Sequence, residues 1–218
     1  MNTNLPRLAA SLLLVLLASA PTHAQTVVSS VNKFGWSENC GHLNFRDAGN
    51  PPTAQGIRVY GSYLTGYIWG ENIGWVHAGN GGPYANTNNT DYGVNYNAGT
   101  GALTGLAWGE NVGWINFSGG ALAVPANAAR IDATRIRGYA WGENIGWINL
   151  DDANVFVGFK CPADFNESGA VSVQDIFDFL AAYFAGLPEA DINGSGTISV
   201  QDIFDFLTAY FSGSGIGC

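Results

Sequence analysis

The apolar and polar positions of residues 25–160 alternate with a period of two over short runs, and glycine-rich turns separate the runs. The segment from Tyr92 to Trp108 is typical of a strand, a glycine turn and a second strand. Residues 56–78 and 129–150 follow the same plan, and residues 154–159 offer a closing strand. We therefore expect a mainly β domain of about ten short strands, organised as antiparallel meanders that form either a closed barrel or a stacked repeat.

One eight-residue motif recurs through this domain. The copies read WGENIGWV at 69–76, WGENVGWI at 108–115 and WGENIGWI at 141–148, and a divergent copy at 36–43 reads WSENCGHL. Their leading tryptophans are 33, 39 and 33 residues apart. A period of this length is typical of one supersecondary unit that buries its apolar face only against its neighbours.

The two tryptophans of a copy occupy alternating strand positions, so they share one face. Two interpretations remain open. The favoured one makes the tryptophan pairs the core, because repeated aromatic residues dominate the burial of a small β domain. In the other, some indoles lie on the surface and stack on the apolar faces of sugar rings. A mixture, with one tryptophan of each pair buried and the other exposed, also fits the pattern.

Each copy carries a glutamate followed by an asparagine in its turn, and the glutamates are Glu38, Glu71, Glu110 and Glu143. Two of them could be the acid and base of a glycosidase, which needs two carboxyl groups about 5 to 10 Å apart. Four equivalent copies argue against that role. We expect instead that the glutamate accepts hydrogen bonds from backbone N–H groups of its own turn, and that the asparagine adopts a left-handed conformation or caps the turn.

Residues 161–218 follow a different pattern, in which two polar twelve-residue loops each run into an apolar-periodic helix. The loops start at Asp164 and Asp191 and share DxNxSGx[VI]SVQD. Oxygen-bearing side chains at positions 1, 3, 5, 9 and 12, a carbonyl at 7 and glycine at 6 follow the EF-hand calcium loop. We expect the two helices to pack face to face. The Phe and Leu side chains should be buried between them. The apolar positions of the two helices are Val173, Ile176, Phe177, Leu180 and Phe184, and Val200, Ile203, Phe204, Leu207 and Phe211.

These 58 residues resemble a type I dockerin, in particular the variant of secreted bacterial chains that opens with Cys-Pro-Ala-Asp and closes with Gly-Cys, here 161–164 and 217–218. The resemblance implies a small all-α domain with two Ca²⁺ ions. The ligands it implies are Asp164, Asn166, Ser168, the Ala170 carbonyl and Asp175 in one loop, and Asp191, Asn193, Ser195, the Thr197 carbonyl and Asp202 in the other, with Ser172 and Ser199 each facing a bridging water.

Dockerins bind a cohesin module, commonly through loop positions 10 and 11, which the resemblance places at Val173, Gln174, Val200 and Gln201. These residues differ from the small hydroxyl pair of many cellulosomal dockerins. The expected partner is therefore a cohesin-like module or a cell-surface component. The body resembles WGENxGW repeats of secreted bacterial proteins, which carry no function over to it.

Residues 1–24 have one basic residue, an apolar run and small residues at the end, as in a secretory signal peptide. The domains expected are thus a signal peptide at 1–24, the β domain at 25–160 and the tail at 161–218, in a protein secreted to the exterior or cell surface and without a transmembrane segment. Export permits a disulfide, and Cys161 and Cys218 lie at the two ends of a duplicated unit whose ends should meet. Cys40 replaces an apolar residue of the motif and should be a buried free thiol.

Without residues 1–24 the chain has seven Lys and Arg against 17 Asp and Glu, and eight of these acids lie in residues 161–218. The absence of basic patches argues against nucleic acid as a partner, and the acidic tail favours cations. We therefore expect a non-catalytic protein with a β domain for binding, with polysaccharide as one candidate ligand, or for surface structure. The alternative is a glycoside hydrolase that carries a dockerin.

Overall fold

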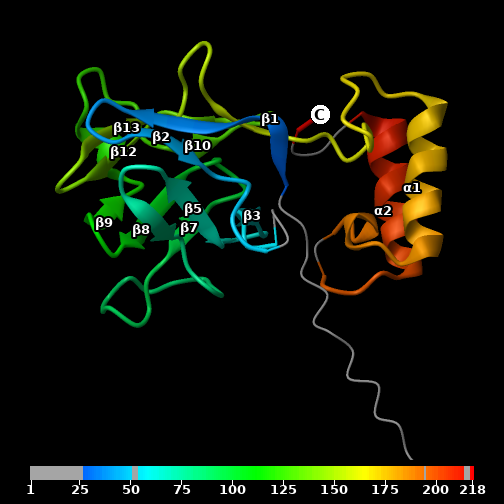
Figure 1. Ribbon diagram of the computed structural model, residues 1–218, viewed down its shortest axis with the longest axis horizontal. Helices are drawn as coiled ribbons and strands as arrows, with labels where there is room; N and C mark the ends of the chain where they lie inside the picture. The colour runs from blue at the N-terminus through cyan, green and yellow to red at the C-terminus, as the bar shows by residue number, and fades with distance from the viewer. Residues whose placement is uncertain (1–26, 51–53, 194, 214–216) are drawn as a thin grey trace, which may run out of the picture.

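The computed structural model describes residues 27–50, 54–193, 195–213 and 217–218. The expected signal peptide lies outside the described residues. Within them, no helix has both the length and the apolar character that crossing a bilayer requires. The chain forms a β domain followed by two helices that lie beside it (Figure 1).

Four hairpins build the β domain, and each contains one copy of the motif, which we number module 1 to module 4 along the chain. The hairpin strands are β1 (Val28–Ser37) and β2 (Gly41–Asn44), β5 (Tyr67–Gly70) and β6 (Gly74–His77), β8 (Leu103–Gly109) and β9 (Gly113–Asn116), and β12 (Tyr139–Gly142) and β13 (Gly146–Asn149). Each hairpin pairs antiparallel with the next. The last pairs with the first, where Trp36 lies opposite Asn149. The sheet is therefore a closed eight-stranded antiparallel barrel, one of the two arrangements that the sequence left open.

The remaining strands are short and lie between or beside the hairpins. They are β3 (Arg58–Val59), β4 (Leu64–Thr65), β7 (Val94–Tyr96), β10 (Arg130–Ile131), β11 (Ile136–Arg137) and β14 (Val157–Phe159), with a 3₁₀ turn, η1, at Gly119–Leu122. The expectation that residues 154–159 close the sheet is wrong, because β13 makes that pairing. Instead β14 pairs with the first half of β1, before β1 turns to join the barrel.

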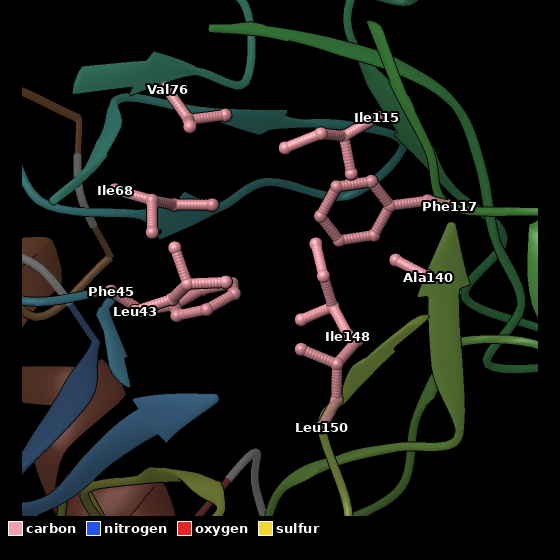
Figure 2. A pocket seen from close by; sticks show the side chains of 9 residues that line it. All are labelled: Leu43, Phe45, Ile68, Val76, Ile115, Phe117, Ala140, Ile148 and Leu150. Carbon is pink, nitrogen blue, oxygen red and sulfur yellow. The ribbon is translucent and has the colours of Figure 1, made fainter. Parts of the chain in front are cut away.

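Aliphatic and phenylalanine side chains fill the barrel (Figure 2). Ile68 on β5 and Val76 on β6 point into the barrel, and the tryptophans next to them in the sequence point outward. Equivalent positions of the other modules supply Leu43, Ile115, Ala140 and Ile148, and Phe45, Phe117 and Leu150 form the next layer. The space left between them is only about 10 Å³, roughly one water-sized sphere. The interior is thus a packed core with no room for a ligand.

Each module turn is a three-residue hairpin loop, and its glycines explain the motif. In module 2 the amide of Ile73 donates to the carbonyl of Gly70 at 3.2 Å, and Gly74 has a φ of +75°. A left-handed residue after a type I turn is the usual end of such a loop, and glycine adopts it without steric cost. A Cβ on Gly70 would lie 2.6 Å from the Ile73 side chain, so glycine is needed there for space.

The tail contains α1 (Val173–Ala185) and α2 (Val200–Ser212), joined through a 3₁₀ turn, η2, at Pro188–Ala190. The expected helix interface is partly wrong. Phe179 and Phe206 form its centre, with stacked rings whose centroids are 4.3 Å apart. Ile176, Leu180, Ile203 and Leu207 pack around them as expected. The remaining phenylalanines of the expected interface, Phe177, Phe184, Phe204 and Phe211, face solvent instead, as do Val173 and Val200.

Tail and barrel are joined by a small set of polar contacts, and a disulfide closes the base of the tail itself. Glu167, in the first loop, accepts hydrogen bonds from the backbone amide and the hydroxyl of Ser30 and lies 3.6 Å from the guanidinium of Arg46. Cys161 and Cys218 form a disulfide, which confirms the predicted pairing. Cys40 is a buried free thiol, as expected. A disulfide is typical of proteins that mature in an oxidising compartment.

Candidate functional site

The tryptophans of the modules lie on the outside of the barrel, and the favoured interpretation that they form the core is wrong. Trp36, Trp69, Trp75, Trp141 and Trp147 are between 37% and 44% exposed, and Trp108 and Trp114 are half-buried. Because neighbouring strand residues face opposite sides, the β-branched and small residues of the motif take the interior and the indoles must face outward. The alternating pattern predicted that the two tryptophans of a module share one face of the sheet, but it did not indicate whether that face is the interior or the exterior of the barrel.

Within each of modules 2 to 4 the two indoles lie directly opposite each other on the hairpin. Ring centroids are 4.5 Å apart for Trp69 and Trp75, and 4.6 Å apart in the pairs of modules 3 and 4. In module 1 His42 replaces the second indole and lies 4.8 Å from Trp36. Edge-to-face and tilted geometries of this kind stabilise cross-strand pairs. Together the pairs form a belt of aromatic side chains around the barrel, which we call the tryptophan belt.

The asparagines of the motif link the modules into a ring. Each side-chain amide donates to a backbone carbonyl of the preceding module, at distances of 3.0 to 3.1 Å. The four bonds run from Asn72 to Cys40, from Asn111 to Ile73, from Asn144 to Val112 and from Asn39 to Ile145. The last bond closes the circle. The expectation that these asparagines are left-handed or cap their own turn is therefore wrong, because their partners lie on the neighbouring hairpin.

The glutamates of the four turns are exposed. The expected hydrogen bonds to their own turns are not formed, since Glu38, Glu71, Glu110 and Glu143 make no side-chain hydrogen bond or ion pair to any residue that the structure describes. In modules 2 to 4 the backbone amide of the apolar residue already donates to the carbonyl of the first glycine and closes the turn. These carboxylates are thus available to a ligand at the surface.

Where module 4 meets module 1, the belt borders an open groove of about 980 Å³. Tyr139 and Trp147 come from module 4, and Trp36 and Glu38 come from module 1. The segment 122–125 forms one wall, where Leu122 and Val124 are almost fully exposed. Lys and Arg are missing from the lining of this groove, which contains the carboxylates of Glu38 and Asp152.

A second groove, of about 270 Å³, lies where module 2 meets module 3. Tyr67 and Trp75 come from module 2, and Trp108 and Glu110 come from module 3. His77 also lines it, and its Nδ1 lies 2.8 Å from the hydroxyl of Tyr92. Burial lowers the pKa of His77, only partly offset by a hydrogen bond with the backbone of Gly79, so this imidazole is neutral at pH 7.

The two polar loops of the tail gather the oxygens that the dockerin resemblance assigns to calcium. In the first loop the Ser168 hydroxyl lies 3.4 Å from a carboxylate oxygen of Asp164 and 3.2 Å from the carbonyl of Ala170. The second loop repeats this with Ser195, at 3.3 Å from Asp191 and 3.0 Å from the carbonyl of Thr197. Gly169 and Gly196 have φ near +85°, which suits the sharp turn at position 6.

Asp175 and Asp202, at position 12, are fully buried. Each accepts bonds from the serine that precedes its helix and belongs to a capping box, with Ser172 or Ser199 as the N-cap. The serines at position 9 therefore contact the helix start. Although burial opposes ionisation, hydrogen bonds from Ser172 and the amide of Asn166 lower the pKa of Asp175. Among the described residues no three His, Cys, Asp or Glu side chains converge on a metal position, so each loop would rely on two carboxylates and neutral oxygens.

Sequence reasoning missed Asp178 and Asp205, which hold the loops in shape. Each accepts a bond from the position-3 asparagine and another from the glutamine at position 11, at 2.8 to 2.9 Å. The repeated VQDIFD segment was the signal for them. Gln174 and Gln201, two of the predicted partner-binding residues, are exposed beside Val173 and Val200, so the four positions lie at the start of the two helices on the outer surface.

Comparison with protein-family models, with curated proteins and with solved structures finds no match to this chain.

Proposed function

We propose that this is an exported, non-catalytic protein whose barrel binds carbohydrate through the tryptophan belt and whose tail is a calcium-dependent docking module. One observation carries the proposal: the indoles of the repeated motif face solvent, although a small β domain would gain most from burying them. Large apolar faces kept at the surface in a repeated arrangement mark an interaction site.

The outward indoles also favour binding over a purely structural surface role. A structural protein needs the modules to close into a barrel, and the aliphatic interior and the asparagine ring already accomplish this. The tryptophans add little to that core. Flat indole faces with hydrogen-bonding groups beside them suit a pyranose ring, which has apolar C–H faces and polar hydroxyls at its rim.

The tail's donor set fits calcium. Its oxygens come from carboxylates, an amide, a hydroxyl and a backbone carbonyl, which is the chemistry that Ca²⁺ prefers. Asp175 and Asp202 are buried, and neither makes an ion pair with a Lys or Arg in the described part of the chain. A bound cation would supply the missing counter-charge. With two carboxylates a site, the affinity should suit the millimolar calcium of extracellular fluids.

The exposed apolar side chains of α1 and α2 support docking. Val173, Phe177 and Phe184 on α1 and their equivalents on α2 repeat in the same order. Such a surface suits a cohesin-like module or another component of the cell surface. Val173, Gln174, Val200 and Gln201 are the contacts we propose for it.

The intact protein should bind at least one polysaccharide on a glycan array, and Trp141→Ala should weaken that binding, since Trp141 is exposed in the belt. The alternative function, a glycoside hydrolase, predicts in addition that reducing sugar is released from the bound polysaccharide. Binding without release supports the proposal. An array on which the folded protein binds no glycan contradicts it.

A further inference from the structure

The two grooves of the tryptophan belt occupy equivalent positions in the repeat. Four residues correspond between them: Tyr139 with Tyr67, Trp147 with Trp75, Trp36 with Trp108 and Glu38 with Glu110. Each groove therefore combines the tyrosine and second tryptophan of one module with the first tryptophan and the glutamate of the module that follows. The same set of four residues therefore occurs at two module junctions.

The other two module junctions lack this set. At the junction of modules 1 and 2, the positions of the tyrosine and second tryptophan hold Phe34 and His42. At the junction of modules 3 and 4, Leu106 replaces the tyrosine, and η1 packs against β12 beside Trp141. Complete sets thus alternate with incomplete ones around the ring. In a closed ring of four hairpins, two junctions that are two steps apart lie on opposite sides of the barrel.

The charges of the grooves select the ligand. Their linings hold Glu38, Asp152 and Glu110 and no Lys or Arg, and His77 is neutral. An acidic polysaccharide would meet like charge with no compensating cation. Hydroxyl and amino groups, in contrast, can donate to these carboxylates. Those of Glu38 and Glu110 have no protein partner among the described residues, whereas one oxygen of Asp152 accepts from the backbone amides of Asn154 and Val155. The shared chemistry is a pyranose polymer without acidic groups, either neutral or bearing amines.

We propose that the barrel is bivalent: the junction of modules 4 and 1 and the junction of modules 2 and 3 each bind one segment of a non-acidic polysaccharide, on opposite sides of the molecule. This inference rests on the proposed carbohydrate-binding function and deepens it. Because the two sites face away from each other, one protein molecule joins two polysaccharide chains. Such cross-linking raises the strength of attachment to an insoluble glycan well beyond that of one site.

The test uses the intact protein and soluble oligosaccharides from a β-1,4-glucan and from a β-1,4-linked glucosamine polymer, with oligogalacturonate as the acidic comparison. Titration calorimetry should find two sites a molecule for at least one of the first two ligands and none for the acidic one. Trp147→Ala and Trp75→Ala should each weaken one site by about tenfold or more, the loss expected for truncating a central aromatic contact. The double variant should lose both sites.

Polymer cross-linking separates this inference from the function on which it rests. With the long soluble polymer, the wild type should increase turbidity, and either single variant should still bind but no longer cross-link. Phe34→Ala is the matched control, because Phe34 takes the same module position as the two tyrosines and lines neither groove. One site in the wild type, or complete loss of binding in one single variant that remains folded, overturns bivalency. Failure of the wild type to bind any of these ligands instead counts against carbohydrate binding itself.

Discussion

Two of the residues at which module 1 departs from the motif compensate for each other. Ser37 stands where the other modules have glycine, and Cys40 stands where they have isoleucine or valine. In module 4 a Cβ on Gly142 would come within 2.5 Å of the Ile145 side chain. The smaller thiol at position 40 leaves room for the serine Cβ. The Ser37 hydroxyl then bonds to the carbonyl of Ile145 at 3.3 Å.

We therefore predict that Cys40→Ile overpacks this end of the barrel and lowers the free energy of unfolding by about 1 to 3 kcal/mol. Adding Ser37→Gly should recover most of the loss, although the serine hydrogen bond is then missing. Chemical denaturation of the two single variants and the double variant measures the coupling. Equal losses with and without the serine would contradict the compensation.

The asparagine ring can be probed with a nearly isosteric change. Asn111→Asp keeps the shape of the side chain but places a carboxylate oxygen 3.0 Å from the carbonyl of Ile73, which offers no proton. Losing the hydrogen bond should cost about 1 kcal/mol, and the repulsion adds to this. Thermal unfolding should show a larger loss for Asn111→Asp than for Asn111→Ala. Asn154→Asp, at an exposed position outside the ring, serves as the control and should change little.

The turn glutamates should contribute little to stability. Glu110 and Glu143 are exposed, and their carboxylates lack hydrogen-bond partners in the described part of the chain. Glu110→Gln and Glu143→Gln should therefore change the free energy of unfolding by less than about 0.5 kcal/mol. Thermal melts test this. If carbohydrate binding holds, Glu110→Gln should weaken it at the junction of modules 2 and 3. A marked loss of stability would restore the turn role that the sequence favoured.

At the scale of elements, the sequence predicted where the hairpins lie but not which face of each hairpin turns into the barrel. Glycine spacing and period-two alternation are local properties, and they located the four hairpins. The direction of the indoles depends on which face of the sheet closes inward, and that choice is collective. Aliphatic residues occupy the interior of the barrel, since its narrow lumen holds Ile68 and Val76 but has no space for two indoles from every hairpin.

The tail helices show the same limit. Each helix carries apolar residues on two stripes, one centred on Phe179 or Phe206 and one on Phe177 or Phe204. Periodicity identifies both stripes but cannot decide which one meets the other helix. The two polar loops of the tail lie at the opposite extreme. Their ligand spacing is local, and the sequence alone located the loops and both helix starts.

The loops should control the folding of the tail. Its buried core is small and is centred on Phe179, Ala182, Phe206 and Ala209. A core of this size rarely keeps a domain folded without a metal, a disulfide or a partner. We predict that chelator lowers the helical circular dichroism signal of the intact protein and that calcium restores it. Asp164→Ala and Asp191→Ala should each remove one of two calcium ions in a calorimetric titration. Equal helicity with and without chelator would contradict the coupling.

At the scale of the whole molecule, Glu167 joins tail to barrel. It belongs to the first polar loop of the tail, has a left-handed φ of +53°, and accepts hydrogen bonds from Ser30 of β1. Partial burial alone would raise its pKa, but the hydrogen bonds from Ser30 and the charges of Arg46 and Lys160 outweigh this and lower the pKa. The second loop has glycine at the equivalent position 194. Only the first loop therefore carries this side-chain contact to the barrel.

The lowered pKa makes this junction sensitive to acid. A carboxyl whose pKa is lower in the folded state stabilises it above the unfolded pKa of about 4.3, and the contribution is lost as pH falls through the folded value. Glu167→Gln should lower the melting temperature at pH 6, through loss of about 1.5 to 3 kcal/mol. It should also flatten the decline from pH 5 to pH 3. Glu143→Gln is the exposed control, and an unchanged pH profile for Glu167→Gln would exclude this role.

The disulfide at the base of the tail also determines the path of mechanical load. Cys161 lies two residues after the end of β14, and Cys218 is bonded to it, so the two arms of the tail leave the barrel from one point. Tension applied to the helices through the proposed docking contact would be divided between the two arms. Because the disulfide holds both arms at the base, the force could not detach one arm from the barrel before the other. The load would then reach the antiparallel pairing of β14 with β1 as shear, so under a steady pull we expect the docking contact to part before the tail unravels.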